Sequence, residues 1–442
     1  MARRRAHSPL DVLINARRVG RLSRSAGGAT SFQYDLAWLQ WPNQFPVSLS
    51  LPLRPDAYSG DPVQAVFDNL LPDNPDIRRR IAERTGAKGT DPFSLLTQIG
   101  RDCIGAMQFL PQGIEQDVPF EIRGRHLADA DIERLLNSLA REPLGIDAHE
   151  DFRISIAGAQ EKTALLFQNG EWQRPEGGTP TTHILKPQLG QIPTADGIID
   201  LSNSVENEHY CLTLLEAFGL PVAQTRIADF GQKRVLVVER FDRQWRDDGR
   251  LIRLPQEDAC QALGIPSAQK YQSYGGPSAV DILKLLRSSD DSQRDQLNFF
   301  KSQILFWLIG ATDGHGKNFS LFLRPGGRFE LTPFYDVLSA QPAFDARRIA
   351  HRNFKLAMSV GKGRHYKILN IEGQHFVQTA REAGLGLSPV RRAIEEIRDL
   401  AHDALELARA RMPMDFHDDI HRSVAAAVGT RLPRLTSADD AL

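Results

Sequence analysis

A short polar loop near residue 315 sets a carboxylate five residues before a carboxamide. The loop reads Ala311-Thr-Asp-Gly-His-Gly-Lys-Asn-Phe-Ser320, with Asp313 and Asn318 as the two reactive side chains. In phosphoryl-transfer enzymes of the protein-kinase type, an Asp at this spacing accepts the proton of the attacking hydroxyl and the Asn holds Mg²⁺. Ordinary turn chemistry is the alternative, because Asp and Gly are common wherever a turn needs a positive φ.

The residues after this loop predict a β-hairpin that returns a second carboxylate to it. Two strand-like runs, 319–323 and 329–334, flank a Pro-Gly-Gly turn at 324–328. Because a hairpin brings its outer ends together, Asp336 should meet Asn318. We therefore predict that Asp313 is the proton acceptor and that Asn318 and Asp336 converge on one metal.

Such chemistry also needs a cover over the phosphates and a lysine that binds them. Small residues let backbone amides approach phosphate oxygens, and the predicted cover consists of Ala157, Gly158, Ala159, Gln160, Glu161 and Lys162. Lys186, which ends a strand-like run, is the predicted phosphate-binding lysine, and Lys162 is a second candidate. A strand-end lysine in water is the alternative for Lys186. A Walker-type P-loop is disfavoured, because the segment after Lys162 reads as a strand and not a helix.

Carboxylates on the next helix could pair with the phosphate-binding lysine. The candidates are Glu206 and Glu208, near the start of a helix predicted at 203–218. Acidic residues in a first helical turn also serve as plain complements to the helix dipole, so both interpretations stay open.

Two further segments complete the predicted nucleotide site. Glu239, Arg240 and Phe241 leave the sheet and would offer backbone groups to an adenine ring. Lys317 could neutralise the γ-phosphate or face solvent. His315 is counted among the cofactor-binding residues, either as packing of the 311–320 loop or as support behind the ligands, because a lone histidine without a partner at metal-ligand spacing rarely binds metal.

Composition limits the class of protein. The 442 residues suffice for about three ordinary domains or two large lobes. A hydrophobic content of 41% describes a soluble globular chain, and a net charge of −1 argues against a protein that grips nucleic acid over its whole surface. Cys103, Cys211 and Cys260 are too scattered for zinc and predict reduced thiols. Without an apolar span or signal peptide, the expected location is the cytoplasm, with no membrane partner.

Hydrophobic periodicity predicts an α+β chain, a mixed sheet followed by a helical block. Expected strands are 12–15, 19–22, 29–34, 47–51, 103–110, 153–156, 163–167, 181–186, 224–229, 234–239 and 355–360. Expected helices are 62–70, 76–84, 92–99, 128–141, 203–218, 256–263, 278–287, 291–310, 369–382 and 388–411. We predict an N-terminal α/β subdomain at 1–115, a smaller lobe with the phosphate-binding loop at 116–241, a mainly helical lobe with the catalytic loop at 242–428, and a disordered tail at 429–442.

Taken in order along most of the chain, these motifs resemble the HipA family, the kinase toxins of bacterial type II toxin–antitoxin modules. The matching segments are Phe67-Asp-Asn-Leu-Leu-Pro-Asp73, Ile99-Gly-Arg-Asp-Cys-Ile-Gly105, Ser155-Ile-Ala-Gly-Ala-Gln-Glu-Lys-Thr163, His183-Ile-Leu-Lys-Pro187, Val205-Glu-Asn-Glu-His-Tyr210, Val238-Glu-Arg-Phe-Asp-Arg243, the Thr312 to Ser320 loop and Phe334-Tyr-Asp336.

The resemblance implies a two-lobed protein-kinase-like fold with an additional N-terminal subdomain, and ATP and Mg²⁺ as cofactors. It implies Asp313 as catalytic base, Asn318 and Asp336 as Mg²⁺ ligands, and Ser155 as a self-phosphorylation site that switches the enzyme off. It further implies serine/threonine phosphorylation of a protein, possible targets being aminoacyl-tRNA synthetases, and so arrest of translation and growth. A HipB-like helix-turn-helix antitoxin would neutralise the toxin and link it indirectly to DNA.

Two other functions stay open at this point. Aminoglycoside phosphotransferases, which act on small molecules, share the spacing of five between Asp and Asn. A corepressor without catalytic activity would keep the fold only to hold its antitoxin on DNA. Intact Lys186, Asp313, Asn318 and Asp336 argue against such a loss of activity.

Overall fold

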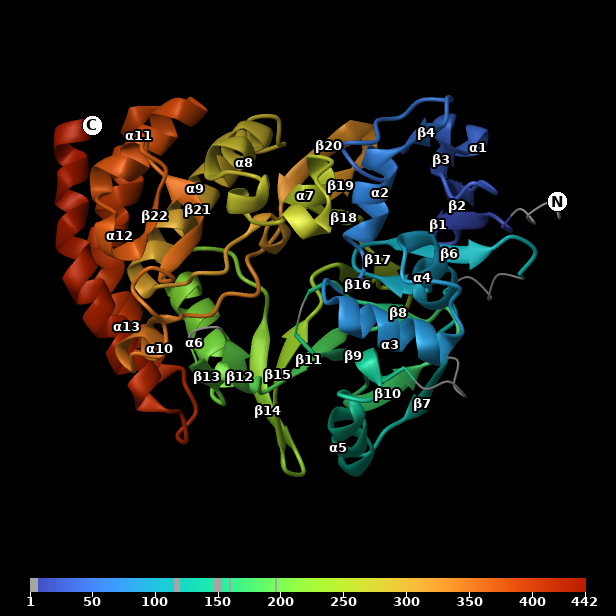
Figure 1. Ribbon diagram of the computed structural model, residues 1–442, viewed down its shortest axis with the longest axis horizontal. Helices are drawn as coiled ribbons and strands as arrows, with labels where there is room; N and C mark the ends of the chain where they lie inside the picture. The colour runs from blue at the N-terminus through green and yellow to red at the C-terminus, as the bar shows by residue number, and fades with distance from the viewer. Residues whose placement is uncertain (1–6, 115–119, 147–152, 159, 195–196) are drawn as a thin grey trace. The chain divides into compact units, whose positions relative to one another are not determined.

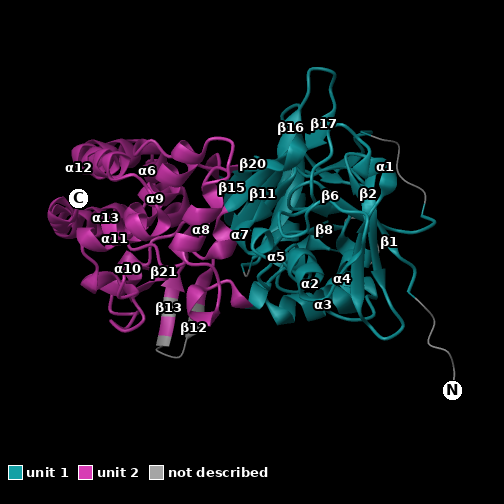
Figure 2. Cartoon of the chain, turned by 90° about the horizontal axis from the view of Figure 1, so that it is seen from above, with its two compact units in different colours: residues 1–187, 228–268, 320–329 teal, residues 188–227, 269–319, 330–442 magenta. Residues whose placement is uncertain are grey.

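The computed structural model describes residues 7–114, 120–146, 153–158, 160–194 and 197–442 (Figure 1). The chain divides into two compact units (Figure 2). Unit 1 comprises residues 1–187, 228–268 and 320–329, and unit 2 comprises residues 188–227, 269–319 and 330–442. The predicted boundary at residue 115 does not separate compact units, because the N-terminal region and the following sheet share unit 1. The expected mixed α+β class is confirmed.

Unit 1 begins with an antiparallel five-stranded sheet in the order β4-β3-β2-β1-β6. Its strands are β1 (Leu10–Ile14), β2 (Arg17–Arg24), β3 (Thr30–Tyr34), β4 (Tyr58–Ser59) and β6 (Met107–Pro111). The helices of this region are α1 (Leu36–Leu39), α2 (Asp61–Asp68), α3 (Pro75–Thr85) and α4 (Pro92–Ile99). Alternation along β1 places Leu10 and Val12 in the core, both fully buried.

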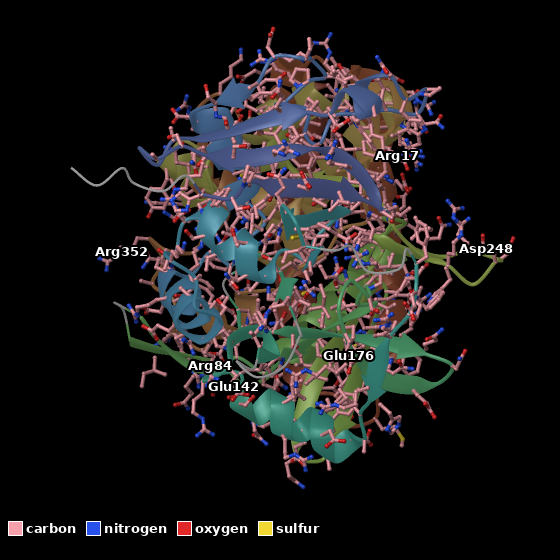
Figure 3. All side chains as sticks on the ribbon, turned by 90° about the vertical axis from the view of Figure 1, so that its right-hand side faces the viewer. Arg17, Arg84, Glu142, Glu176, Asp248 and Arg352 are labelled. Carbon is pink, nitrogen blue, oxygen red and sulfur yellow. The ribbon has the colours of Figure 1, made fainter. Side chains whose placement is uncertain are left out.

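Helix α3 shows how local sequence sets element ends. The Asn74 side chain accepts a hydrogen bond from the backbone N–H of Asp76, and Pro75 occupies the first turn. Gly86 ends the helix at φ 69°, a left-handed conformation that glycine adopts without penalty. An ion pair of 3.5 Å then joins Arg84 to Glu142, side by side at the surface (Figure 3).

The second sheet of unit 1 has six strands in the order β14-β15-β11-β9-β10-β7. They are β7 (Gly124–His126), β9 (Thr163–Gln168), β10 (Glu171–Pro175), β11 (His183–Pro187), β14 (Thr225–Phe230) and β15 (Lys233–Glu239). Helix α5 (Asp129–Ser138) packs Ile132, Leu135 and Leu136 against this sheet. Burying each such side chain contributes about 1.5–3 kcal/mol.

Short ladders complete unit 1. They are β5 (Asp102–Cys103) with β8 (Ile154–Ser155), β16 (Arg243–Trp245) with β17 (Leu251–Arg253), and β18 (Gln256–Asp258) with β19 (Ser320–Arg324) and β20 (Arg328–Leu331). The predicted helix at 256–263 was wrong in its first half. Residues 256–258 pair with β19, and the helix is only α7 (Ala259–Ala262), capped by Asp258.

The predicted strand at 47–51 was also wrong. Burial does not alternate along this segment, because Ser48 is buried together with Val47 and Leu51 while Leu49 is only partly buried. Hydrogen bonds to residues outside the segment take the place of a strand ladder. The N–H of Val47 donates to Tyr34 Oη at 2.9 Å, and the hydroxyl of Ser48 donates to the carbonyl oxygen of Gln261 at 3.1 Å.

Unit 2 is mainly helical. Its helices are α6 (Ser204–Ala217), α8 (Ala279–Leu286), α9 (Ser292–Ile309), α10 (Gln341–Asp345), α11 (Gly373–Ala383), α12 (Leu387–Ala410) and α13 (Asp418–Arg431). Its hairpins are β12 (Gly190–Thr194) with β13 (Gly197–Leu201), and β21 (Lys355–Val360) with β22 (His365–Lys367). Helix α9 contacts α6, α8, α12 and α13, and its second half is almost entirely buried. It therefore forms the core that carries the loop at 311–319.

The predicted disordered tail was wrong as well. Residues 429–431 end α13, and Leu432–Ala441 form the 3₁₀ helix η7, which packs on α11. Leu435 and Ala438 are fully buried, so the polar composition of this segment conceals an apolar contact. Cys103, Cys211 and Cys260 are buried free thiols. Across the described part of the chain, helices are too short or too polar to cross a membrane.

Candidate active site

The loop at 311–319 begins where α9 stops. Gly310 has φ 72°, and its N–H donates to the carbonyl oxygens of Phe306 and Trp307, which closes the helix. Gly314 lies against the Phe306 ring so closely that a Cβ would approach two of its atoms to 2.7 Å. Glycine is therefore required at Gly314 by contact and at Gly310 by backbone conformation.

Hydrogen bonds within the loop set Asp313 and Asn318 in place. The backbone carbonyl oxygen of Asp313 accepts from the N–H of His315 and from Asn318 Nδ2, both at 2.8 Å. Asp313 is exposed, whereas Asn318 is only 7% exposed. Because Nδ2 of Asn318 is used by the loop, its Oδ1 is the atom that could bind a cation.

Asp336 joins this loop through the residue before it. Tyr335 Oη donates to the carbonyl oxygen of Lys317 at 2.8 Å. Strands β19 and β20 flank the short 3₁₀ turn Pro325–Gly327, as the sequence predicted. Asp336 itself is half-buried with φ 58°, a left-handed conformation uncommon outside glycine. Such backbone strain gathers at functional sites, where surrounding contacts enforce it.

Contacts on both sides of Asp336 hold its segment. Before it, the N–H of Ala223 donates to the carbonyl oxygen of Phe334 at 2.8 Å. After it, Asn207 and Ser339 exchange two hydrogen bonds, Nδ2 to the carbonyl oxygen at 2.9 Å and N–H to Oδ1 at 2.8 Å. Both residues are buried, so α6 fixes the chain that leaves Asp336. This link joins residues 132 positions apart, so no local sequence pattern reveals it.

These residues fit Mg²⁺ in donor chemistry. One carboxylate and one amide oxygen are hard ligands, and Mg²⁺ in nucleotide enzymes takes few protein ligands, the rest being water and phosphate. No group of three or more His, Cys, Asp or Glu side chains in the described part of the chain is suited to a metal ion, here or elsewhere. Asn318 and Asp336 would hold the ion, and a site of this kind needs the nucleotide to complete it.

A tyrosine that the sequence analysis missed contacts the predicted base. Tyr271 Oη donates to Asp313 Oδ1, and the tyrosine ring meets the His315 ring edge to face, with centroids 4.9 Å apart. His315 is 4% exposed, which supports its interpretation as a packing residue. Lys317 is 6% exposed, so the solvent-facing alternative for it was wrong. No local pattern marks Tyr271, which precedes Asp313 by 42 residues.

In unit 1, the predicted phosphate cover lies between β8 and β9 and is tied down at several points. The carbonyl oxygen of Gly158 accepts from the N–H of Asp73 at 3.1 Å, and Gln160 Nε2 donates to the carbonyl oxygen of Pro187 at 3.0 Å. Lys162 Nζ folds back to the carbonyl oxygen of Ala157 at 3.0 Å. The chain continues into strand β9, so a Walker-type P-loop is excluded. Ala159 lies outside the described residues.

Ser155 precedes this cover and is completely buried. Its Oγ donates to the carbonyl oxygen of Leu70 at 2.7 Å, and it pairs with Cys103 in the parallel β5–β8 ladder. A phosphate could not be accommodated in this position. The dianion would lose its hydration, and the carbonyl oxygen that Ser155 contacts is an acceptor that cannot donate a hydrogen bond to it.

Lys186 lies on the central strand β11, opposite Leu236 of β15, and is 6% exposed. The alternative of a strand-end lysine in water was therefore wrong. Glu206 and Glu208 are buried in the first turns of α6, and Glu206 Oε2 accepts from Gln188 Nε2 at 2.7 Å. Their pairing with Lys186 stays a prediction, because Lys186 belongs to unit 1 and both glutamates belong to unit 2.

The predicted adenine hinge needs one correction, at Arg240. Its side chain is 1% exposed, its N–H donates to the carbonyl oxygen of Thr182, and its carbonyl oxygen accepts from the N–H of Arg243. Arg240 is therefore occupied within the protein and does not present these groups to a nucleotide. Glu239 is exposed at the end of β15, and Phe241 meets Phe322 edge to face, so these two remain the candidates.

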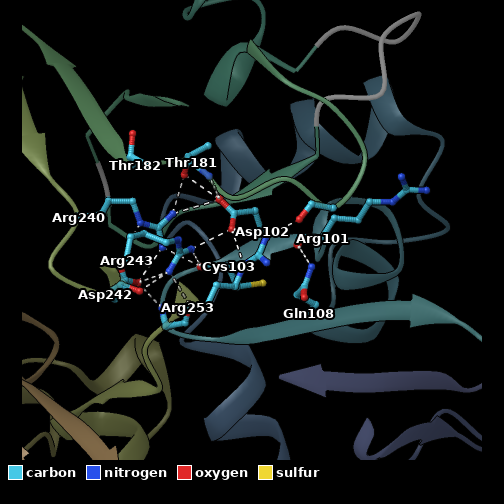
Figure 4. Close-up of polar contacts among 12 residues, drawn as sticks. Arg101, Asp102, Cys103, Gln108, Thr181, Thr182, Arg240, Asp242, Arg243 and Arg253 are labelled. Atoms are coloured by element: carbon cyan, nitrogen blue, oxygen red, sulfur yellow. Dashed lines mark hydrogen bonds and ion pairs between the residues drawn. The ribbon is translucent and has the colours of Figure 1, made fainter. Parts of the chain in front are cut away.

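Arg240 belongs to a buried cluster of charges (Figure 4). Three guanidinium groups, from Arg240, Arg243 and Arg253, contact Asp102, with N–O distances of 3.3, 2.9 and 3.0 Å. Asp242 accepts from Arg240 Nη2 at 2.8 Å and from the N–H of Gly105 at 2.6 Å. The cluster ties the region that follows α4 to Arg240 within the hinge and to Asp242 and Arg243 directly after it.

Burial alone would raise the pKa of the Asp102 carboxyl, but the three arginines outweigh burial and hold that pKa well below its usual range. Burial, together with the neighbouring guanidinium of Arg240, lowers the pKa of Arg243 to about 10. Asp102, Asp242, Arg240 and Arg243 therefore stay ionised at neutral pH.

Two protein-family models match this chain. The HipA-like C-terminal domain family matches residues 154–406, more than half of the chain, and the HipA N-terminal domain family matches residues 10–110. The chain belongs to the HipA family. The HipA-like C-terminal domain match includes Asp313, Asn318 and Asp336.

Named relatives agree with this family assignment. Y4mE of Sinorhizobium fredii is 34% identical over 400 residues, which cover 90% of each chain. The serine/threonine-protein kinase toxin HipA of Shewanella oneidensis is 31% identical over 335 residues, 73% of this chain and 72% of that one. The fold also matches a chain in the solved complex of Shewanella oneidensis HipA, HipB and operator DNA, with a TM-score of 0.79 at 23% identity. The match covers 98% of this chain and 99% of that one. The two proteins share a fold.

Within this HipA-family chain, each unit gathers one part of the predicted site. Unit 2 holds the loop with Asp313, His315, Lys317 and Asn318, and attaches Asp336 to it through Tyr335. Unit 1 holds Ser155, the cover at 157–162, Lys186 and the hinge.

Proposed function

We propose that this HipA-family chain is an ATP- and Mg²⁺-dependent serine/threonine protein kinase that acts as the toxin of a toxin–antitoxin module. The observation that carries the proposal is the arrangement around Asp313. Asn318 Nδ2 donates to the backbone of Asp313, whose carboxylate is exposed, and leaves the Asn318 amide oxygen for a cation. Tyr335 Oη donates to the same loop and so attaches the next residue, Asp336, which has a strained backbone.

The residues then take the following roles in phosphoryl transfer. Asp313 accepts the proton of the acceptor hydroxyl at Oδ2, while Tyr271 holds Oδ1 and so orients the carboxylate. Asn318 and Asp336 would hold Mg²⁺, which would offset the charge of the phosphates. Lys186 and Lys162, together with the backbone of the cover, bind phosphate oxygens. Lys317 lies beside Asn318 and adds positive charge next to the γ-phosphate.

Ser155 is the proposed site of self-phosphorylation. Because its hydroxyl is buried against Leu70, strand β8 must leave β5 before transfer, and the phosphate then prevents its return. Residues 157–162 directly follow this strand, so the modification would displace the phosphate cover and switch the enzyme off. The charge added is about −1.5 to −2 at neutral pH.

Partners and targets follow from the family. A helix-turn-helix antitoxin of the HipB kind would neutralise the chain and connect it to DNA, as HipB accompanies HipA in the Shewanella complex. Phosphorylation of a cytoplasmic protein, an aminoacyl-tRNA synthetase being the expected class, would arrest translation and growth.

One labelling experiment tests the proposal. The purified full chain is incubated with Mg²⁺ and γ-labelled ATP, alone and with a cytoplasmic extract, and labelled residues are mapped by mass spectrometry. We expect label on Ser155 and on serine or threonine of other proteins, and none with Asp336→Asn. Label on an aminoglycoside but on no protein would indicate a small-molecule kinase. Absence of label from every acceptor, with the chain still bound to its antitoxin, would indicate a corepressor.

A further inference from the structure

A pocket of about 720 Å³ opens beside Asp313, entirely within unit 2. Thr312 and Asp313 form one wall, and β21, β22 and the turn between them form another. Asn318, Asp336 and Lys317 do not line it among the described residues, so it is separate from the predicted metal and phosphate groups. It shares the general base Asp313 and the tyrosine that orients it, Tyr271, with that site. A molecule bound there would thus lie on the acceptor side of Asp313.

The pocket is strongly basic. Four cationic side chains line it, those of Arg352, Lys355, Arg364 and Lys367, and Asp313 is the single carboxylate among the described lining residues. All four are exposed, and Figure 3 shows Arg352 at the surface. Within the described ranges, Lys355, Arg364 and Lys367 form no ion pair with a carboxylate.

The backbone brings these cations together in an arrangement that destabilises the fold. Lys355 of β21 lies directly opposite Lys367 of β22 in the ladder, and like charges in that arrangement destabilise a strand pair. Arg364 has φ 50°, a left-handed conformation that is rare for a long side chain, in a turn closed by its own N–H to the carbonyl oxygen of Gly361 at 3.0 Å. Neither feature contributes to stability, which points to an anionic ligand.

We propose that this pocket binds an acidic segment of the substrate protein, next to the serine or threonine that Asp313 deprotonates. The inference rests on the proposed kinase function and adds the class of substrate. Negative side chains flanking the acceptor would meet Lys355, Arg364 and Lys367, while the acceptor hydroxyl faces Asp313. Leu356, Ala357 and Tyr366 offer apolar surface for the methylene groups of those side chains. Nucleic acid is disfavoured as the occupant, since the chain has net charge −1 and the cations gather in one pocket beside the base.

The sequence before Ser155 has the expected character. Residues 147–151 read Asp-Ala-His-Glu-Asp, which puts three carboxylates within eight residues of the proposed self-phosphorylation site. The chain thus supplies a natural probe, a peptide of residues 147–158.

The test compares kcat/KM for this peptide with that for a neutral version carrying Asp147→Asn, Glu150→Gln and Asp151→Asn. We expect the acidic peptide to be preferred, and the preference to fall about two- to fivefold for each of Lys355→Gln and Lys367→Gln, the range for exposed ion pairs. Added salt should reduce the preference, because exposed charges are screened. Lys362→Gln is the matched control, an exposed lysine of the same turn that does not line the pocket, and should change nothing.

A charge exchange makes the result decisive. The double variant Lys355→Glu, Lys367→Glu should prefer a peptide with lysines at positions 147, 150 and 151 over the acidic one. Equal use of the acidic and neutral peptides by the unaltered chain would overturn the pocket assignment while leaving the kinase proposal intact. RNA binding is measured alongside for the unaltered chain and the double variant. If the double variant loses RNA binding while its peptide preference is unchanged, the pocket assignment would also be overturned. If the unaltered chain labels neither Ser155 nor any peptide or protein, that result would instead contradict the proposed function.

Discussion

The Asp313→Asn variant is expected to lose about 10²–10⁴-fold in kcat for protein phosphorylation, the range that a general base contributes. Asparagine cannot accept the hydroxyl proton, but it keeps the shape of aspartate and an oxygen for the Tyr271 hydroxyl. Asn318 Nδ2 binds the backbone carbonyl of residue 313 and not its side chain, so the loop should keep its conformation. Affinity for Mg²⁺·ATP and the melting temperature should therefore change little.

The measurement is steady-state phosphorylation of a protein acceptor, with nucleotide affinity from calorimetry. Asp403→Asn, on the exposed side of α12, is the control and should have the kcat of the unaltered chain. Growth arrest should be lost with Asp313→Asn and kept with Asp403→Asn. An Asp313→Asn variant that still phosphorylates protein within a few-fold of the normal rate would remove Asp313 from the mechanism.

The Asp102→Asn variant is expected to destabilise unit 1 by about 3–5 kcal/mol, the usual result of removing one partner from a buried ion pair. Arg240 and Arg243 would then keep only the Asp242 carboxylate, and Arg253 would lose the carboxylate that it contacts. Hydrogen exchange at the amides of residues 100–110 and 240–253 measures the free energy of local opening, which suits a chain with two units. Asp248→Asn, in the exposed pair with Arg250 near β16, should leave that free energy unchanged.

The same cluster predicts a pH dependence. The pKa of Asp102 is lower in the folded chain than the usual value of about 3.9 for an unfolded Asp. Its stabilising contribution is thus fully present above about pH 4 and is lost as the pH falls toward the folded value. The difference in opening free energy between the unaltered chain and Asp102→Asn should shrink in acid. A difference that stays constant down to acidic pH would mean that the charge of Asp102 is not what stabilises the cluster.

Local patterns were sufficient where the site is contiguous in sequence. The loop at 311–319 and the hairpin after it depend on glycine, proline and polar residues within a few positions, and the sequence predicts them. The central strand β11 with Lys186 was also predicted, because its apolar run is bounded by Pro187.

The failures share a physical cause, which is the satisfaction of polar groups by residues far along the chain. Residues 47–51 bond to Tyr34 and Gln261 instead of a strand, and Gln256–Asp258 pair with β19 although a helix follows. Arg240 was predicted to offer its backbone to an adenine ring, and local sequence does not reveal its buried contact with Asp102, 138 residues earlier. Tyr271 and Asn207 likewise contact the site from positions far away in the sequence.

A crystal structure of the full chain with Mg²⁺ and a non-hydrolysable ATP analogue would test the central claim most directly. We expect one Mg²⁺ about 2.0–2.1 Å from Asn318 Oδ1 and from a carboxylate oxygen of Asp336, the distances usual for this ion. The γ-phosphate should lie next to that ion, with the Asp313 carboxylate facing it across the space for an acceptor hydroxyl. A nucleotide-bound ion held by other residues, with the Asp336 carboxylate out of its reach, would contradict the account.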